Sequence, residues 1–179
     1  MGSVSEVHLT PRQAERLMAA ARAARPEEAC GALIGTVRRG RVEVERIEPL
    51  SNVAAEPKRR YEIDPRQLLD LQRSGRDGGF EVVGYYHSHP SGDAVPSDVD
   101  RRSAWPGLSY LICSVDEGGC CRLRSWRLVE GRFVEEAVST AVRGRRQAPP
   151  LQRSEAAARN GRAHSRPTAA EGSRETQVG

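Results

Sequence analysis

Short stretches of apolar residues predict a series of β-strands along the chain. In residues 42–47 apolar and polar side chains alternate, as they do in a half-buried strand. Residues 80–86 and 109–115 are apolar runs of the kind found in buried strands. The expected strands are residues 7–9, 30–37, 42–47, 80–89, 109–115, 121–128 and 133–134, with 121–128 as an outer strand.

One stretch between the first two strands has the period of an amphipathic helix. Thr10 is a suitable N-cap, Pro11 suits the first helical position, and Gln13 is placed to complete a capping box. Apolar residues then recur at positions 14, 17, 18 and 21, so they share one face. The sequence therefore predicts a helix that begins after Thr10 and buries this face.

Two further helices are expected. Asp64-Pro65 repeats the same start signal, and this helix is expected to bury Leu68, Leu69 and Leu71 and to end at the glycines 75, 78 and 79. A shorter helix is expected from Ser97 to about residue 105. Mixed helices and strands, with hairpins near both ends, indicate an α+β domain built on one sheet.

Composition divides the chain into two parts. No Phe, Trp or Tyr occurs after Phe133, and residues 143–179 contain eight Arg and three Glu. This segment has a net charge of +5 against +4 for the whole chain, so residues 1–142 are left with −1. A segment without large apolar residues cannot offset its ordering entropy by burial. We therefore expect residues 1–142 to form one domain and residues 143–179 a disordered basic tail.

The near-neutral charge of residues 1–142 argues against a nucleic-acid-binding domain, since the basic pI belongs to the tail. The four cysteines have no zinc-finger spacing; Cys113 is expected to be a buried thiol and Cys30 to be structural. The sequence shows neither a signal peptide nor an apolar run long enough to span a bilayer. These features predict a cytoplasmic protein with no membrane partner.

The candidate chemistry lies at the end of the strand predicted for residues 80–89. Side chains alternate across a strand, so His87 and His89 point the same way, and Pro90 is expected to end the pairing. Asp100 follows in the first turn of the next predicted helix. Two imidazoles and one carboxylate form a ligand set typical of catalytic zinc, with the fourth position left for water.

A hydrolytic site of this kind needs a base for the water's proton and a donor for the oxyanion. Ser97 precedes Asp100 by three residues, shares its face of the helical turn, and is the candidate donor. The same Ser-x-x-Asp pattern is also a capping box that starts helices. Both roles remain open for Ser97, and the base must come from elsewhere in the chain.

Two segments together resemble the signature of the JAMM, or MPN-plus, metalloproteases. The first is the string His-x-His-x(7)-Ser-x-x-Asp of residues 87–100, and the second is Pro-x-Glu-x-Cys-Gly at residues 26–31. The resemblance covers roughly residues 5–138. It implies a single mixed sheet flanked by helices, in an α/β three-layer arrangement similar to that of cytidine deaminase.

The resemblance also implies a role for each motif residue. His87, His89 and Asp100 would hold Zn²⁺, Glu28 would be the general base, and Ser97 would stabilise the oxyanion. The family acts on amide or isopeptide bonds at the C-terminus of ubiquitin or ubiquitin-like proteins. Residues 61–65 and 87–112 look like small bacterial members that process sulfur-carrier proteins with a Gly-Gly tail, either by trimming residues after it or by releasing cysteine.

Two other interpretations stay open. Residues 89–93 and 96–97 also look like those of RadC-type proteins, which are associated with DNA repair. The second interpretation is a non-catalytic interaction scaffold, because family relatives without metal ligands act only in that way. A separate question concerns the basic run of residues 58–60, which is either ordinary solvated surface or a patch that binds an acidic partner.

Overall fold

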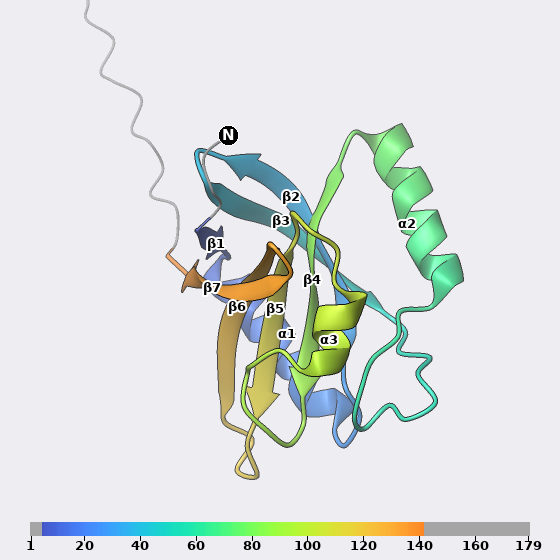
Figure 1. Cartoon of the computed structure of the whole chain (residues 1–179), viewed down its shortest axis with the longest axis vertical. Coiled ribbons are helices and arrows are strands. Elements are labelled where there is room, and N and C mark those ends of the chain that lie inside the picture. Colours follow the sequence, from blue (N-terminus) through green and yellow to red (C-terminus); the bar gives the residue numbers. More distant parts are fainter. Residues whose placement is uncertain (1–4, 142–179) are drawn as a thin grey trace, which may run out of the picture. The chain divides into compact units, whose positions relative to one another are not determined.

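The strands form one mixed sheet that closes on itself in the computed structural model, which describes residues 5–141. Their order is β1-β3-β2-β4-β5-β6-β7, and β1 is parallel to both β3 and β7. β4 and β5 are parallel too and run side by side through the centre of Figure 1. The strands are β1 Glu6–His8, β2 Cys30–Arg38, β3 Arg41–Leu50, β4 Glu81–His89, β5 Ser109–Val115, β6 Cys121–Val129 and β7 Arg132–Ser139.

The expected combination of one mixed sheet with helices is confirmed. The closed sheet, however, does not form the clear middle layer of the expected three-layer arrangement, because the short strand β1 joins β3 to β7. The expectation that residues 121–128 form an outer strand is wrong, since β6 pairs with both β5 and β7. The pattern of a single strand records its burial and carries no information about its neighbours.

The first helix, α1 Pro11–Ala24, begins as its sequence predicts. Thr10 is the N-cap, and its side chain and that of Gln13 form the reciprocal capping box. The Gln13 amide also donates to the backbone carbonyls of Val44 and Glu45, at 3.1 and 3.0 Å, which attaches the start of α1 to β3. Figure 1 shows α1 behind the sheet and the short helix α3 Asp98–Ser103 in front of it.

The second helix, α2 Pro65–Gly78, differs from its expected pattern in two respects. Leu71 is buried as predicted, but Leu69 is 43% exposed and does not belong to the inner face. The helix also continues through two of its glycines and ends only at Gly79, which has a left-handed φ of 67°. Gly75 is buried within the helix, and a Cβ there would lie only 3.1 Å from the carbonyl oxygen of Phe80, so the close approach of Phe80 favours glycine at this position.

β4 is buried because both of its faces are covered. Tyr86 packs in the cluster that contains Leu17 of α1, whereas Tyr85 packs in the cluster that contains Leu71 of α2. On the neighbouring strand β2, a Cβ at Gly31 would overlap the Tyr86 ring and the backbone of β3. This close approach fixes β2 against β4 at the end of the strand where the two histidines lie.

Some expectations are met within the described residues and others fall outside them. Cys113 is buried, as expected, and burial raises the pKa of its thiol to about 12. The thiol of Cys30 is also buried and contacts the Leu50 carbonyl, which fits a structural role. None of the helices within residues 5–141 has the length and apolar character of a membrane span. The basic segment 143–179 lies outside the described residues.

Candidate metal centre

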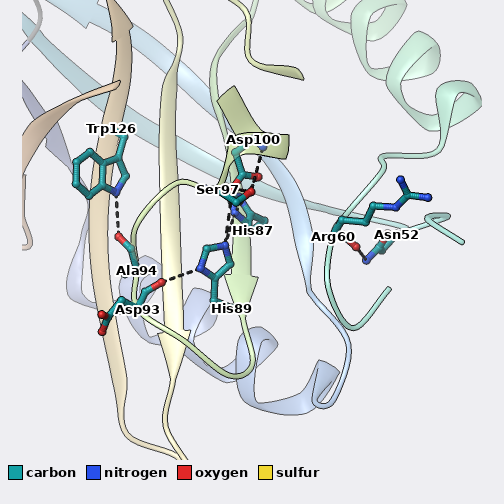
Figure 2. Close-up of polar contacts among 9 residues, drawn as sticks. All are labelled: Asn52, Arg60, His87, His89, Asp93, Ala94, Ser97, Asp100 and Trp126. Atoms are coloured by element: carbon teal, nitrogen blue, oxygen red, sulfur yellow. Dashed lines mark hydrogen bonds and ion pairs between the residues drawn. The ribbon is translucent and has the colours of Figure 1, made fainter. Parts of the chain in front are cut away.

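His87, His89 and Asp100 meet where β4 ends and α3 begins (Figure 2). The two imidazoles lie on the same face of β4, and their Nε2 atoms are 3.0 Å apart. Asp100 Oδ1 lies 3.4 Å from His87 Nε2, and Asp100 Oδ2 lies 3.9 Å from His89 Nε2. The side chains are 1%, 15% and 8% exposed in the order His87, His89, Asp100, so three polar groups converge in a largely buried position.

These separations fit a metal ion. A tetrahedral zinc with bonds of about 2.0–2.2 Å places its ligand atoms roughly 3.3–3.6 Å from one another. The observed separations of 3.0, 3.4 and 3.9 Å lie around that value. The residues expected to be metal ligands are therefore brought together in a geometry that suits a metal ion.

The surroundings of His89 select the tautomer that a ligand needs. Its Nδ1 lies 2.7 Å from the backbone carbonyl oxygen of Asp93, as Figure 2 shows. A carbonyl only accepts hydrogen bonds, so Nδ1 carries the proton and Nε2 presents its lone pair to the cluster. A histidine ligand is commonly oriented by a bond of this kind from its other ring nitrogen.

His87 is held mainly by packing. Its ring stacks on Tyr61, with the centroids 4.5 Å apart and the planes 21° from parallel. Its Nδ1 is buried and has no hydrogen-bond partner among residues 5–141. Its polar contacts within the described residues therefore lie on the Nε2 side, toward His89 and Asp100.

The capping box of α3 orients Asp100. The backbone N–H and the hydroxyl of Ser97 both donate to Asp100 Oδ2, each at 2.6 Å, and the Asp100 N–H donates back to the Ser97 hydroxyl at 3.2 Å. Burial disfavours the ionised carboxyl, but His87 and these hydrogen bonds outweigh it and hold the pKa of Asp100 below its usual range. The expected capping role of Ser97 is confirmed, and its hydroxyl is positioned at the cluster.

Glu28 lies in the cavity beside the cluster. This cavity of about 250 Å³ is lined by Glu28, Lys58, Arg59, His89, Pro90, Ser91, Ser97 and Asp100. The backbone N–H of Glu28 donates to the Pro57 carbonyl at 2.7 Å. Burial raises the pKa of Glu28 to about 7; the charge of His87 opposes the rise and that of Asp100 adds to it. The buried carboxyl of Glu28, which precedes β2 in the chain, thus lines the same cavity as the candidate ligands His89 on β4 and Asp100 on α3.

Three residues that support the site were not singled out from the sequence. The first is Ser88, which points away from the histidines. Its hydroxyl accepts from the Ala29 N–H at 2.8 Å, and its own N–H donates to the Ala29 carbonyl at 2.9 Å. These bonds fasten the segment next to Glu28 onto β4, and the pattern of alternating strand residues gave no sign of them.

The second such residue is Asn52, whose side-chain amide uses both of its ends. Its Nδ2 donates to the carbonyls of Glu28 and Arg60, at 3.0 and 3.2 Å, and Figure 2 shows the latter bond. Its Oδ1 accepts from the N–H groups of Ala54 and Glu62, at 3.1 and 3.0 Å. Asn52 therefore joins the backbone of Glu28 to the loop that carries the basic run.

The third is Trp126 on β6, whose indole N–H donates to the carbonyl of Ala94 at 3.0 Å (Figure 2). Ala94 is fully buried and lies next to Asp93, whose carbonyl orients His89. The segment that joins His89 to Asp100 in the candidate ligand set is thus attached to the sheet. A tryptophan far along the chain carries no local signal of this contact.

A second cavity adjoins the first. It has a volume of about 260 Å³ and is mostly apolar, and Asp100 lines both cavities. Its wall comprises Tyr61, Glu62, Ile63, Leu68, Tyr85, Val99, Asp100, Ser103, Trp105 and Tyr110. The candidate metal centre therefore lies where a polar cavity and an apolar cavity meet.

Comparison with known proteins places this geometry in a family. Residues 10–129 match the family of prokaryotic homologs of the JAB domain. The chain belongs to this family. The resemblance to JAMM/MPN-type hydrolases noted from the two sequence segments is thereby confirmed.

Individual relatives agree with this assignment. A desampylase from Haloferax volcanii is 43% identical over 114 residues, which are 63% of this chain and 79% of that protein. A CysO-cysteine peptidase from Mycobacterium tuberculosis is 35% identical over 124 residues, 69% of this chain and 83% of that one. The solution structure of a protein from Desulfitobacterium hafniense gives a TM-score of 0.68 at 36% identity and covers 75% of this chain and 92% of its own.

Replacing Asn52 by Asp should test how far its amide holds the site together. In Asn52→Asp the carbonyls of Glu28 and Arg60 lose their donor and face a carboxylate. The free energy of unfolding should fall by about 1–3 kcal/mol, the cost of acceptors left unsatisfied, as measured by urea denaturation. Gln72→Glu, the same amide-to-acid change at an exposed position, is the control and should stay near wild type. Equal stability of the two variants would contradict the role given to Asn52.

Proposed function

We propose that this protein is a zinc-dependent hydrolase that cleaves an amide bond at the C-terminus of a ubiquitin-like or sulfur-carrier protein with a Gly-Gly tail. The bond is a peptide bond, an isopeptide bond or a carrier–cysteine amide. The observation that carries the proposal is the convergence of His87, His89 and Asp100 at a cavity that Glu28 also lines. The names of the relatives, a desampylase and a CysO-cysteine peptidase, support the substrate class.

In this proposal His87, His89 and Asp100 hold the zinc through the two Nε2 atoms and a carboxylate oxygen. A zinc ion held there supplies a water of lowered pKa and polarises the carbonyl of the scissile bond. The protein contributes the fixed ligand positions, because the Asp93 carbonyl orients His89 and Ser97 orients Asp100. Such supporting bonds reduce the reorganisation that binding would otherwise require.

Glu28 is the proposed general base. Hydrolysis of an amide requires that a proton be taken from water and delivered to the leaving nitrogen, and one carboxyl can do both in turn. Glu28 is the carboxyl available for this, since Asp100 is occupied by Ser97 and His87. The bonds of its backbone to Pro57 and Asn52 keep it in the cavity.

Ser97 is the proposed oxyanion donor, and this role is compatible with its role as a cap. Its hydroxyl donates a hydrogen bond to Asp100 Oδ2, which also accepts from the Ser97 backbone N–H. If the hydroxyl turns toward an oxyanion, the carboxylate retains the backbone bond. The same residue can thus start α3 and assist the reaction.

The metal prediction is one zinc per chain. Metal analysis of the full chain should give one equivalent, and zinc should raise the melting temperature because it binds the folded state. Asp100→Ala should weaken zinc binding by more than about 10–100-fold, the loss seen when only a supporting residue is removed. Asp98→Ala, an exposed acid in the same helical turn, is the matched control. Zinc binding that is the same in both variants would exclude this ligand set.

The base prediction is tested with Glu28→Gln, which keeps the shape of the side chain and removes its base. The zinc-loaded variant should retain its metal and lose about 10²–10⁴-fold in the rate of cleavage of a carrier conjugate ending in Gly-Gly, followed by mass spectrometry. Glu27→Gln is the neighbouring exposed control. A wild-type protein that binds no zinc and cleaves no conjugate would support the scaffold interpretation, and one that binds DNA instead of cleaving a conjugate would support the RadC-like interpretation.

Ser97→Ala separates the two roles of this residue. Loss of an oxyanion donor typically lowers turnover by about 10²–10³-fold, whereas loss of a cap lowers stability by roughly 1 kcal/mol. We expect both effects in the same preparation, measured as turnover at saturating conjugate and as melting temperature. Wild-type turnover in a less stable protein would leave Ser97 with the capping role alone.

A further inference from the structure

The cavity of Glu28 contains two positive charges that the proposed reaction leaves without a task. Lys58 and Arg59 line it together with Glu28, His89 and Ser97. Their side chains form neither a hydrogen bond nor an ion pair with any residue in the 5–141 range that the structure describes. Cations at a concave site without internal partners are available to an anionic group of a ligand.

The backbone holds this basic pair beside Glu28. The Glu28 N–H donates to the carbonyl of Pro57, the residue before Lys58, at 2.7 Å. Asn52 binds the carbonyls of both Glu28 and Arg60, on the other side of the pair. Hydrogen bonds on both sides of Lys58 and Arg59 therefore hold the backbone of this pair near that of Glu28, and their exposed side chains line the same cavity as Glu28.

The two cavities give the substrate a direction, provided that the proposed function holds. The base returns its proton to the leaving nitrogen, so the leaving group occupies the polar cavity that Glu28 lines. The carrier's tail then lies toward the apolar cavity that Asp100 also lines. The basic pair consequently faces the part of the substrate that is released.

We propose that Lys58 and Arg59 bind the α-carboxylate of the released residue, and that the preferred substrate carries a single amino acid after its Gly-Gly tail. In such a substrate the carboxylate is separated from the scissile nitrogen only by the α-carbon, so it enters the cavity with the leaving group. A lysine side chain joined through its ε-nitrogen has no carboxylate at that position. The basic pair thus favours release of a free amino acid over cleavage of an isopeptide bond.

Arg60 supplies a matched control within the same run. Its backbone carbonyl binds Asn52, but its side chain points away from the histidines in Figure 2 and does not line the cavity. Arg60→Gln removes the same unit of charge from the loop as Arg59→Gln. A difference between these two variants therefore measures the effect of a charge inside the cavity. It cannot arise from a general attraction between the loop and an acidic substrate, which both variants reduce equally.

The test compares three forms of one carrier-tail peptide with the zinc-loaded full chain. The first ends in Gly-Gly-Cys with a free carboxylate, the second in the same sequence as a carboxamide, and the third has its terminal Gly joined to the ε-nitrogen of a blocked lysine. A charge-assisted hydrogen bond is worth about 10–100-fold in binding. The wild type should therefore cleave the free acid with a kcat/KM about 10–100-fold above that of the carboxamide, mainly through KM.

The variants should remove this preference selectively. Arg59→Gln should lower the preference for the free acid over the carboxamide, whereas Arg60→Gln, which removes the same charge, should keep it. Adding Lys58→Gln to Arg59→Gln should bring kcat/KM for the free acid down to that of the carboxamide. The binding affinity of Glu28→Gln for the labelled acid and carboxamide, measured by fluorescence anisotropy, should show the same ratio without turnover. This second readout does not depend on the rate of reaction.

Two results would overturn the inference and leave the proposed function standing. One is equal cleavage of the acid and the carboxamide by the wild type. The other is a loss in the double variant that is equal for all three peptides, which would mean that the basic pair contacts the carrier itself. Failure of the wild type to cleave any of the three would overturn the inference together with the proposed function.

Discussion

The pairing of β4 with β2 is the constraint on which the site depends. It places Cys30 opposite His87, and the two hydrogen bonds between Ser88 and Ala29 continue the contact by one more residue. Glu28 directly precedes Ala29 in the chain, so this register also determines where Glu28 lies. Because a shift of one residue in a strand turns every side chain to the opposite face, the register that buries Tyr85 and Tyr86 also decides where His87 and His89 point. The strand register that packs the core therefore also places the candidate ligands.

The cluster itself is costly in the absence of a ligand. Two imidazole nitrogens and a carboxylate are removed from water within 4.8 Å of one another, and His87 keeps a buried ring nitrogen without a partner among the described residues. Burial of polar groups is unfavourable unless hydrogen bonds or a metal compensate for it. The capping box of Ser97 and Asp100 compensates part of this cost and at the same time starts α3. The Ser97 and Asp100 side chains that cap α3 are therefore also part of the candidate site.

The surroundings of the cluster are asymmetric, and this asymmetry carries the inference about the released residue. Asp100 is common to an apolar cavity with Tyr85, Trp105 and Tyr110 and to a polar cavity with Lys58 and Arg59. The loop with the basic pair is tied to Glu28, and the link between the ligands is tied to Trp126. The polar cavity is thus built from segments that hydrogen bonds anchor to one another and to the sheet.

The sequence by itself determined the features that depend on residues a few positions apart. The caps at Thr10 and Ser97, the start of α2 at Asp64 and the common face of His87 and His89 all follow from helical or strand geometry over a single turn or repeat. The two motif segments also allowed the family and the candidate site residues to be identified before any contact was known. These features could be predicted because the interacting groups are close in the chain.

Only the tertiary structure decided which distant segments meet. Closure of the sheet through β1, the inner position of β6 and the exposure of Leu69 depend on neighbours that no local pattern specifies. The same holds for Asn52 and Trp126, and for the location of Lys58 and Arg59 in the cavity while Arg60 stays outside it. A polar residue in a loop looks the same in sequence whether it faces solvent or a cavity lined by a buried carboxyl. The difference arises from packing and hydrogen bonds between segments far apart in the chain, which are formed only when the whole domain folds.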